Sequence, residues 1–311
     1  MKVIITIPVT EEQKKKYAEL KDAEILFADG TTLTEEIVRD AEVIMGNIPH
    51  SLVEKCEKLR WLQLQSAGAN RYTDIPEDVI LTNCAGAFGT AMSEHMMAFV
   101  LMAMKRLEDY YEDQKNCIWK RLGAVGTIAG STVLCIGMGN IGGELAKRMK
   151  AFNAYVIGVQ RTAHEKPDFV DELHTIDELD ELLPRADIVT LSVPHTDKTV
   201  HMIDERRLRL MKKNAILVNV GRGTAIVTDD LVRVLNEGHL AAACLDVTDP
   251  EPLPADHPLW KARNVFITPH VSAGDGTNVT VDNVSDIFYV NLRHYVNNEL
   301  LEHVVNKKQG Y

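Results

Sequence analysis

Short apolar runs alternate with longer charged segments along the chain, a pattern typical of α/β proteins. In the first 83 residues, five runs rich in β-branched residues predict strands at 2–7, 23–28, 41–46, 61–65 and 78–83. The charged segments 11–21 and 51–59 lie between strands and are predicted to be helices. Strands that alternate with helices predict a mostly parallel sheet covered by helices on both faces.

A second series with the same rhythm begins near Gly130. Its predicted strands are 131–137, 154–159, 186–193, 215–220, 241–247 and 264–268, and its predicted helices are 143–152, 204–211 and 228–237. We therefore expect a second doubly wound sheet, and with it a two-domain α/β protein.

Two further helical segments flank the second series. Residues 93–107 are apolar almost all round, which is typical of a helix buried between two layers, and residues 281–296 are amphipathic. A chain that leaves one domain, builds another and returns must cross twice, and these helices are the predicted crossings. The predicted first domain is discontinuous, residues 1–100 and 277–311, around a second domain of residues 101–276.

The composition limits the classes of binding partner but says less about the activity. The chain of 311 residues is 45% hydrophobic and 25% charged, as in ordinary soluble proteins. A net charge of −11 disfavours nucleic acid and anionic membranes as partners, although a local basic pocket for a small acid remains compatible with it.

The cysteines and apolar runs predict a cytoplasmic protein. Five scattered cysteines without CxxC spacing predict free thiols, and no metal site is expected. The apolar run at the start is too short for a secretory signal, and residues 96–104 are too few to span a bilayer.

A glycine-rich hexapeptide, Gly137-Met138-Gly139-Asn140-Ile141-Gly142, lies between a predicted strand and a predicted helix. In that context GxGxxG predicts a dinucleotide site, with the pyrophosphate at the start of the helix. The alternative is a structural glycine turn that binds no ligand.

The end of the next strand bears on the choice of cofactor. NAD-binding sites usually place an acid there for the ribose 2′-hydroxyl, but this chain has Gln160, Arg161 and Thr162. A guanidinium can bind a 2′-phosphate, so NADPH is expected to be preferred over NADH. The alternative is that Arg161 is a solvated loop residue and both NADP and NAD are accepted.

Three segments at predicted strand ends complete a recognisable set: residues 218–223 (VNVGRG), 245–253 with Glu251-Pro252-Leu253, and Thr268-Pro269-His270. Together with the glycine turn and the QSAG loop at Gln65, they resemble the D-isomer-specific 2-hydroxy-acid dehydrogenase family over essentially the whole chain. This resemblance implies a Rossmann dinucleotide-binding domain inserted into a flavodoxin-like substrate domain.

The resemblance also implies catalytic roles for Arg222, Glu251 and His270. Arg222 would bind the substrate's carboxylate and carbonyl with its planar, permanently charged fork. His270 would protonate the carbonyl oxygen as hydride reaches C2, and Glu251 would hydrogen-bond its other ring nitrogen. Taken singly, each residue could instead be structural: a surface salt-bridge arginine, a solvated acid and a satisfied histidine.

Further contacts are implied in the same way. Backbone N–H groups around Ser66, Ala67 and Gly68 would bind the substrate carboxylate, with an ordinary βα turn as the alternative reading. The remaining cofactor contacts implied are Val193, Pro194, Thr196, Val220 and Asp246, the last accepting from the nicotinamide amide.

The expected function is therefore reduction of a small 2-oxo acid, such as glyoxylate or hydroxypyruvate, to a D-2-hydroxy acid. Glu251 stands where formate-oxidising relatives carry glutamine, which disfavours that activity, and the regulatory domain common in phosphoglycerate dehydrogenases is not expected. A homodimer is implied by resemblance alone. The rival hypothesis is a nicotinamide-nucleotide-sensing, corepressor-like protein with incidental turnover, which the absence of a basic stripe disfavours.

Overall fold

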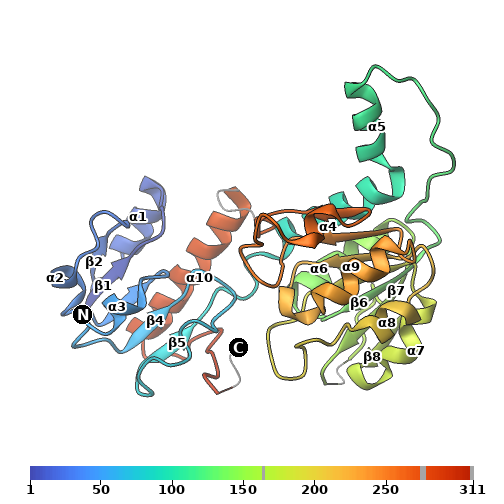
Figure 1. Ribbon diagram of the computed structural model, residues 1–311. Helices are drawn as coiled ribbons and strands as arrows, with labels where there is room; N and C mark the ends of the chain where they lie inside the picture. Colours follow the sequence, from blue (N-terminus) through green and yellow to red (C-terminus); the bar gives the residue numbers. More distant parts are fainter. Residues whose placement is uncertain (163–164, 274–277, 309–311) are drawn as a thin grey trace. The chain divides into compact units, whose positions relative to one another are not determined.

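The computed structural model describes residues 1–162, 165–273 and 278–308. The chain divides into two compact units (Figure 1). The first unit comprises Met1–Phe88 and Asp275–Tyr311, and the second comprises Gly89–Gly274.

The first unit is built on a five-stranded sheet in the order β2-β1-β3-β4-β5, with every neighbouring pair parallel. Its strands are β1 (Lys2–Ile5), β2 (Glu24–Phe27), β3 (Val43–Met45), β4 (Trp61–Gln63) and β5 (Ile80–Thr82). This is the flavodoxin-like strand order, and it brings the loops that follow β3, β4 and β5 to one edge of the sheet.

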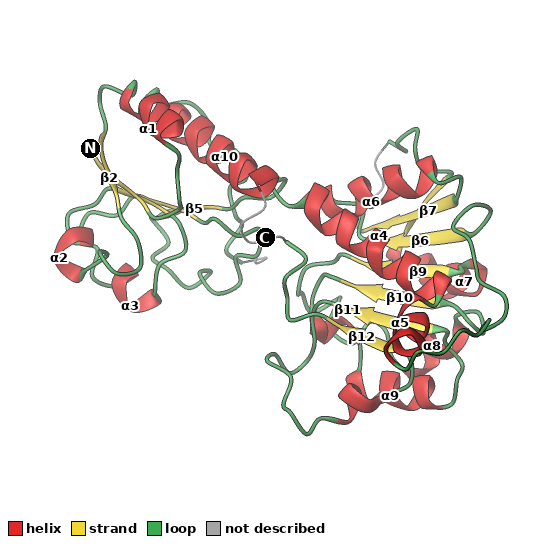
Figure 2. Cartoon of the chain, turned by 90° about the horizontal axis from the view of Figure 1, so that it is seen from above, coloured by secondary structure: helices red, strands yellow, loops and turns green. Residues whose placement is uncertain are grey.

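Helices cover both faces of this sheet: α1 (Glu11–Ala18), α2 (Glu35–Val38), α3 (His50–Val53) and α10 (Asn278–Val296). Figure 2 shows α1 and α10 on one side of the strands and α2 and α3 on the other. The buried Tyr17 of α1 donates a hydrogen bond to the Ser285 carbonyl at 3.1 Å, and its ring packs against Tyr289. These contacts attach the last helix of the chain to the first sheet.

The second unit holds a seven-stranded parallel sheet in the order β12-β11-β10-β9-β6-β7-β8. Its strands are β6 (Thr132–Ile136), β7 (Tyr155–Gln160), β8 (Glu172–Thr175), β9 (Ile188–Leu191), β10 (Ile216–Asn219), β11 (Ala242–Leu245) and β12 (Val265–Ile267). In order of appearance this is 3-2-1-4-5-6 with one strand added, the Rossmann arrangement. The chain adds β7 and β8 on one side of β6 and then returns to place β9 on the other side of β6, so the strand order reverses between β6 and β9.

The helices of this unit are α4 (Gly89–Lys105), α5 (Leu107–Lys115), α6 (Asn140–Ala151), α7 (Leu179–Leu182), α8 (Glu205–Leu210) and α9 (Thr228–Asn236). Short 3₁₀ turns lie at Ile176–Glu178, Leu183–Arg185, Gly223–Ala225 and Pro258–Lys261. In Figure 2, α4 and α6 lie on one side of the strands, with α8 and α9 on the other.

The predicted fold class is confirmed, and every predicted strand is present. The helix predicted at 51–59 is wrong in length, because α3 ends at Val53. There the chain turns away from the helical ladder, and the Glu57 amide donates to the Arg39 carbonyl at 2.9 Å. Strand β8 was not predicted, since its ELHT sequence has no apolar run.

The first crossing precedes the predicted helix 93–107 instead of running through it. The units divide at Phe88 and Gly89, whereas the sequence placed the boundary after residue 100. The reason is that α4 packs along its length against α6, β10 and β11 of the second sheet. The predicted return point at 276 and 277 lies outside the described residues.

Candidate active site

The glycine turn joins β6 to α6, as predicted. Gly137 has a φ of +99°, a left-handed conformation that residues with a side chain rarely adopt. A Cβ on Gly142 would lie 1.8 Å from the Gly137 carbonyl oxygen, so only glycine lets the helix approach the turn. Ser192, at the end of β9, donates to that same carbonyl at 2.9 Å and fixes the turn from the neighbouring strand.

Gly139 is different, because its φ of −74° suits any residue and a Cβ there would meet no protein atom within 4 Å. It is the N-cap of α6 and offers no side-chain cap, and Asn140 and Ile141 form the first helical turn. The unpaired N–H groups and positive end of a twelve-residue helix therefore border open space. This cradle, which a side chain would fill, fits the pyrophosphate of a dinucleotide.

The end of β7 lies beside this turn, since the Gly137 amide donates to the Val159 carbonyl at 2.9 Å. Gln160 ends the strand, and the exposed Arg161 and Thr162 follow it. The Nε2 atom of Gln160 is buried and has no hydrogen-bond partner among the described residues. The fold thus brings these three predicted residues to the sheet edge that carries the glycine turn.

The loops after β9 and β10 meet at the same edge. The Val220 amide donates to the Leu191 carbonyl at 3.1 Å, and a Cβ on Gly221 would lie 2.6 Å from the Val193 carbonyl oxygen. Pro194 and Thr196 continue the β9 loop, in which Thr199 Oγ1 donates to the Pro194 carbonyl and accepts from the Thr196 amide. Val193, Pro194, Thr196 and Val220 therefore lie in two adjoining strand-end loops.

Arg222 follows β10 in an extended conformation that the buried Asn219 fixes. The Asn219 side chain accepts from the Gly221 amide at 3.0 Å and donates to the Arg222 carbonyl at 2.9 Å. The half-buried Arg222 guanidinium donates to the Gly221 carbonyl at 2.7 Å through one nitrogen. A guanidinium has five N–H donors in a planar fork, a geometry that suits it to bind an anion.

His270 and Glu251 are brought together from different loops. His270 Nδ1 lies 2.6 Å from Glu251 Oε1, and both side chains are partly exposed. Because a carboxylate only accepts, Nδ1 carries the hydrogen, and Nε2 is left as the nitrogen that can exchange a proton with a ligand.

Asp246 is 1% exposed, and its carboxylate is occupied by the protein itself. Oδ1 accepts from Thr268 Oγ1 at 2.6 Å and from the Val271 amide at 2.9 Å, and Oδ2 accepts from the Ser272 amide at 3.0 Å. Burial raises the pKa of Asp246, but these hydrogen bonds outweigh it and hold the pKa below its usual value. The predicted contact to the nicotinamide amide stays a prediction; what the structure adds is that Asp246 binds the His270 loop.

In the first unit, the loop after β4 is anchored through its carbonyl groups. The carbonyls of Ser66, Ala67 and Gly68 accept from the Cys84 amide, the Asn83 side chain and the Ser66 hydroxyl at 3.0, 2.8 and 2.8 Å. None of their three amides donates to an acceptor among the described residues. Their N–H groups can therefore bind an anion such as a carboxylate.

Sequence reasoning missed two residues near the site. Ser192 fixes the glycine turn, and His95 of α4 lies with its Nε2 atom 3.2 Å from Thr268 Oγ1. Neither stands in a motif, and no role in the site was expected for His95. Its position on the inner face of an apolar helix was the available signal.

Neither a membrane span nor a metal cluster is found in the part of the chain that the structure describes. No helix in the described ranges is long and apolar enough to cross a bilayer. Nor do the described His, Cys, Asp and Glu side chains form a group of three or more that could hold a metal ion.

A Rossmann unit with a glycine turn, and a histidine–glutamate pair at the same strand ends, define a nucleotide-dependent dehydrogenase. Residues 97–272 match the family model "D-isomer specific 2-hydroxyacid dehydrogenase, NAD binding domain". The chain belongs to the D-isomer specific 2-hydroxyacid dehydrogenase family, whose members are NAD(P)-dependent oxidoreductases.

Relatives of known name support this family membership. D-3-phosphoglycerate dehydrogenase of Methanocaldococcus jannaschii is 32% identical over 98% of this chain, which spans 59% of that longer relative. A crystal structure of a D-isomer specific 2-hydroxyacid dehydrogenase family protein from Aeromonas salmonicida is 33% identical, with a TM-score of 0.89, and the match covers 98% of this chain and 99% of that one.

A third similar structure is the NADPH-dependent glyoxylate/hydroxypyruvate reductase of Sinorhizobium meliloti in complex with NADP and sulfate. It is 25% identical with a TM-score of 0.84, and the match covers 100% of this chain and 99% of that one.

Proposed function

We propose that this protein uses NADPH to reduce a small 2-oxo acid, such as glyoxylate or hydroxypyruvate, to the D-2-hydroxy acid. The observation that carries the proposal is the 2.6 Å contact between His270 and Glu251 at the sheet edge that also bears Arg222 and the glycine turn. The similarity to an NADPH-dependent glyoxylate/hydroxypyruvate reductase supports the choice of substrate and cofactor.

Each residue of the site has its own proposed role in the reaction. A bound reduced nicotinamide supplies the hydride that reaches C2 of the substrate. Arg222 binds the substrate carboxylate and polarises the carbonyl. In the first unit, the amides of Ser66, Ala67 and Gly68 are donors suited to a carboxylate. His270 donates its Nε2 proton to the C2 oxygen as negative charge develops there. Glu251, hydrogen-bonded to Nδ1, keeps the ring oriented and stabilises it while it is protonated.

The preference for NADPH rests on the end of β7. Gln160 and Thr162 carry no charge that would repel a 2′-phosphate, and the Arg161 guanidinium can bind one.

The test is a steady-state assay that follows the absorbance of the reduced nicotinamide. NADPH and NADH are each tested with glyoxylate, hydroxypyruvate, pyruvate and a branched 2-oxo acid. We expect oxidation of NADPH well above that of NADH. His270→Gln should lower kcat by about 10²–10⁴-fold, the usual contribution of a general acid. Undiminished turnover by His270→Gln or by Arg222→Ala would contradict the proposed roles.

Nucleotide binding has its own test at Gly139. Gly139→Val places a side chain in the open cradle and is expected to weaken NADPH binding, measured by titration calorimetry, without loss of folding. The matched control is Gly143→Ala in the same helix, where an added Cβ also meets no protein atom. Equal NADPH affinity in both variants would count against a pyrophosphate at this turn.

We also propose a homodimer formed through α5 and the segment that follows it. This arm projects from the second unit in Figure 1 and carries the exposed apolar side chains Leu107, Tyr111, Ile118, Trp119 and Val125. Trp119 is 104% exposed, and an apolar surface of this kind marks a protein interface. Light scattering should give twice the chain mass, and Trp119→Ser with Ile118→Ser should shift it toward the monomer; a monomeric parent protein would refute this.

A cytoplasmic location is proposed from the cysteines. All five are free thiols, three of them buried in the two cores, as expected in a reducing compartment. Fractionation of the source cells checks this, and recovery outside the cytoplasm would contradict it.

A further inference from the structure

A chain of hydrogen bonds runs from helix α4 to the loop that carries His270. Thr268 Oγ1 lies 2.6 Å from Asp246 Oδ1 and 3.2 Å from His95 Nε2. The ionised Asp246 only accepts, so the Thr268 hydroxyl hydrogen points to Asp246 and its oxygen accepts from His95 Nε2–H. The direction of the chain is therefore fixed, from His95 through Thr268 to Asp246.

Asp246 then holds the remainder of the loop. Its carboxylate accepts from the amides of Val271 and Ser272, and its backbone carbonyl accepts from the His270 amide at 2.8 Å. Residues on both sides of His270 are thus tied to one buried residue. Deleting the Thr268 hydroxyl removes the side-chain attachment at one end of the loop. It leaves the His95 Nε2–H without an acceptor, and Asp246 Oδ1 keeps only its hydrogen bond from the Val271 amide.

His270 itself needs this support. Its φ is +55°, a left-handed conformation that few residues other than glycine adopt and that persists only where the surroundings impose it. The 2.6 Å contact to Glu251 depends on that backbone, because φ sets the direction of the Cα–Cβ bond that carries the imidazole. A relaxed loop would rotate the ring away from both Glu251 and the substrate.

We propose that His95 and Thr268 are positioning residues of the active site, which act through Asp246 to hold the His270 loop in the conformation required for proton donation. The inference rests on the proposed function in that His270 is the proton donor. His95 suits this role because its ring packs edge-on against Phe99, with 4.4 Å between the ring centroids. Burial lowers the pKa of His95 by more than the nearby charge of Asp246 raises it. The neutral ring with hydrogen on Nε2 is the donor that Thr268 requires.

The first pair of variants isolates the Thr268 hydroxyl. Thr268→Val keeps the shape and removes the hydroxyl, whereas Thr268→Ser keeps it. We expect Thr268→Val to lower kcat on the order of 10-fold or more, since small displacements of a reacting group reach that size, with KM for NADPH unchanged. Thr268→Ser should restore the parent kcat. The control is Tyr17→Phe, which deletes a buried hydrogen-bonding hydroxyl in the first unit and should leave kcat unchanged.

The second pair isolates the donor on α4. His95→Gln retains an N–H near the Nε2 position and should keep most of the activity, while His95→Leu should reproduce the fall in kcat seen with Thr268→Val. Hydrogen exchange gives an independent readout. In Thr268→Val and His95→Leu, the amides of His270, Val271 and Ser272 should exchange faster, while amides of the sheet strands keep their protection.

These experiments test the positioning role of His95 and Thr268 separately from the proposed reduction of a 2-oxo acid. Turnover by the parent protein together with a normal kcat in Thr268→Val and His95→Leu would overturn the positioning role and leave the proposed function standing. Faster exchange of the loop amides in these variants, in a parent protein that reduces no 2-oxo acid, would overturn the proposed function. Equal loss of kcat in Tyr17→Phe would mean that any buried deletion lowers activity, and the positioning role would fall.

Discussion

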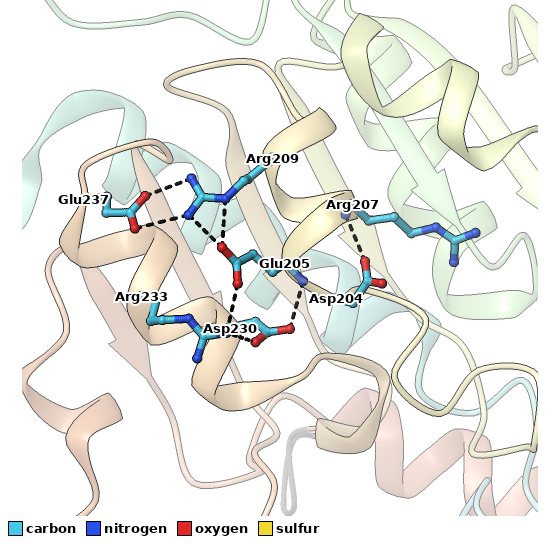
Figure 3. A network of polar contacts seen from close by, with 7 residues as sticks. All are labelled: Asp204, Glu205, Arg207, Arg209, Asp230, Arg233 and Glu237. Atoms are coloured by element: carbon cyan, nitrogen blue, oxygen red, sulfur yellow. Dashed lines mark hydrogen bonds and ion pairs between the residues drawn. The ribbon is translucent and has the colours of Figure 1, made fainter.

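The second unit contains two polar clusters made of similar groups in opposite surroundings. The Asp246 cluster, formed by Asp246, Thr268, His95 and the amides of Val271 and Ser272, is largely buried behind the active-site edge. The surface network of α8 and α9, drawn in Figure 3, comprises Asp204, Glu205, Arg207, Arg209, Asp230, Arg233 and Glu237, and most of its ion-paired side chains are more than a third exposed. The surface network has many more charges, but burial decides how much each contact contributes.

The surface network is a set of shared ion pairs. Arg209 binds Glu205 at 2.7 Å and Glu237 at 2.8 Å, and Arg233 binds Glu205 at 2.9 Å and also Asp230. Apart from Asp230, these side chains are 37–52% exposed, so water and salt replace a contact that is lost. Asp246 itself is 1% exposed, and deletion of its carboxylate leaves several donors without their acceptor.

The largest effect is expected at Asp246. Asp246→Ala removes the acceptor of Thr268 and of the Ser272 amide, and a buried donor left unsatisfied costs roughly 1–3 kcal/mol each. We expect a large fall in the free energy of unfolding, measured by urea titration, together with loss of kcat. A stability equal to that of the parent protein would show that the cluster is far less important than its burial suggests.

The next effect is expected at Asp204, the N-cap of α8, whose carboxylate accepts from the Arg207 amide at 2.9 Å. Asp204→Ala should lower stability by about 0.5–2 kcal/mol, the usual loss for a removed cap. Asp204→Asn retains the capping oxygen and is the matched control. If both variants were equally destabilised, the charge and not the cap would be responsible.

A smaller, pH-dependent effect is expected at His174, which lies between Glu178 and Glu172 at 2.8 Å from each. These carboxylates raise the pKa of His174 above its usual 6.5, so the protonated ring stabilises the fold. That stabilisation is complete below pH 6.5 and is lost as the pH rises through the raised pKa. His174→Gln should therefore be less stable than the parent protein in mildly acidic buffer and should match it in alkaline buffer. A difference that is independent of pH would contradict this.

The smallest effect is expected from Arg209→Gln, although it breaks two ion pairs. Thermal unfolding should show a change close to experimental error at moderate salt, and any difference should shrink further as salt is added. A clear loss of stability that persists at high salt would mean that the surface network contributes as much to stability as the Asp246 cluster does.

The sequence predicted the strands of this protein well because their signals are local. Apolar runs of β-branched residues predicted every strand except β8, whose residues are all only half-buried. The GxGxxG turn was visible because its residues are contiguous, and its geometry follows from Gly137 and Gly142. The motifs also directed attention to Glu251 and His270, which the structure brings to 2.6 Å.

The tertiary structure decided what depends on packing between distant segments. Only the packing of α4 against α6 placed the division of the units before residue 89. Asp246 could be seen as a strand-end acid, but its partners come from a loop more than twenty residues away. His95 meets Thr268 across 173 residues of sequence, and no local pattern can encode such a contact. Periodicity along the chain determines helices and strands, whereas hydrogen bonds between them exist only after the sheet has brought its edges together.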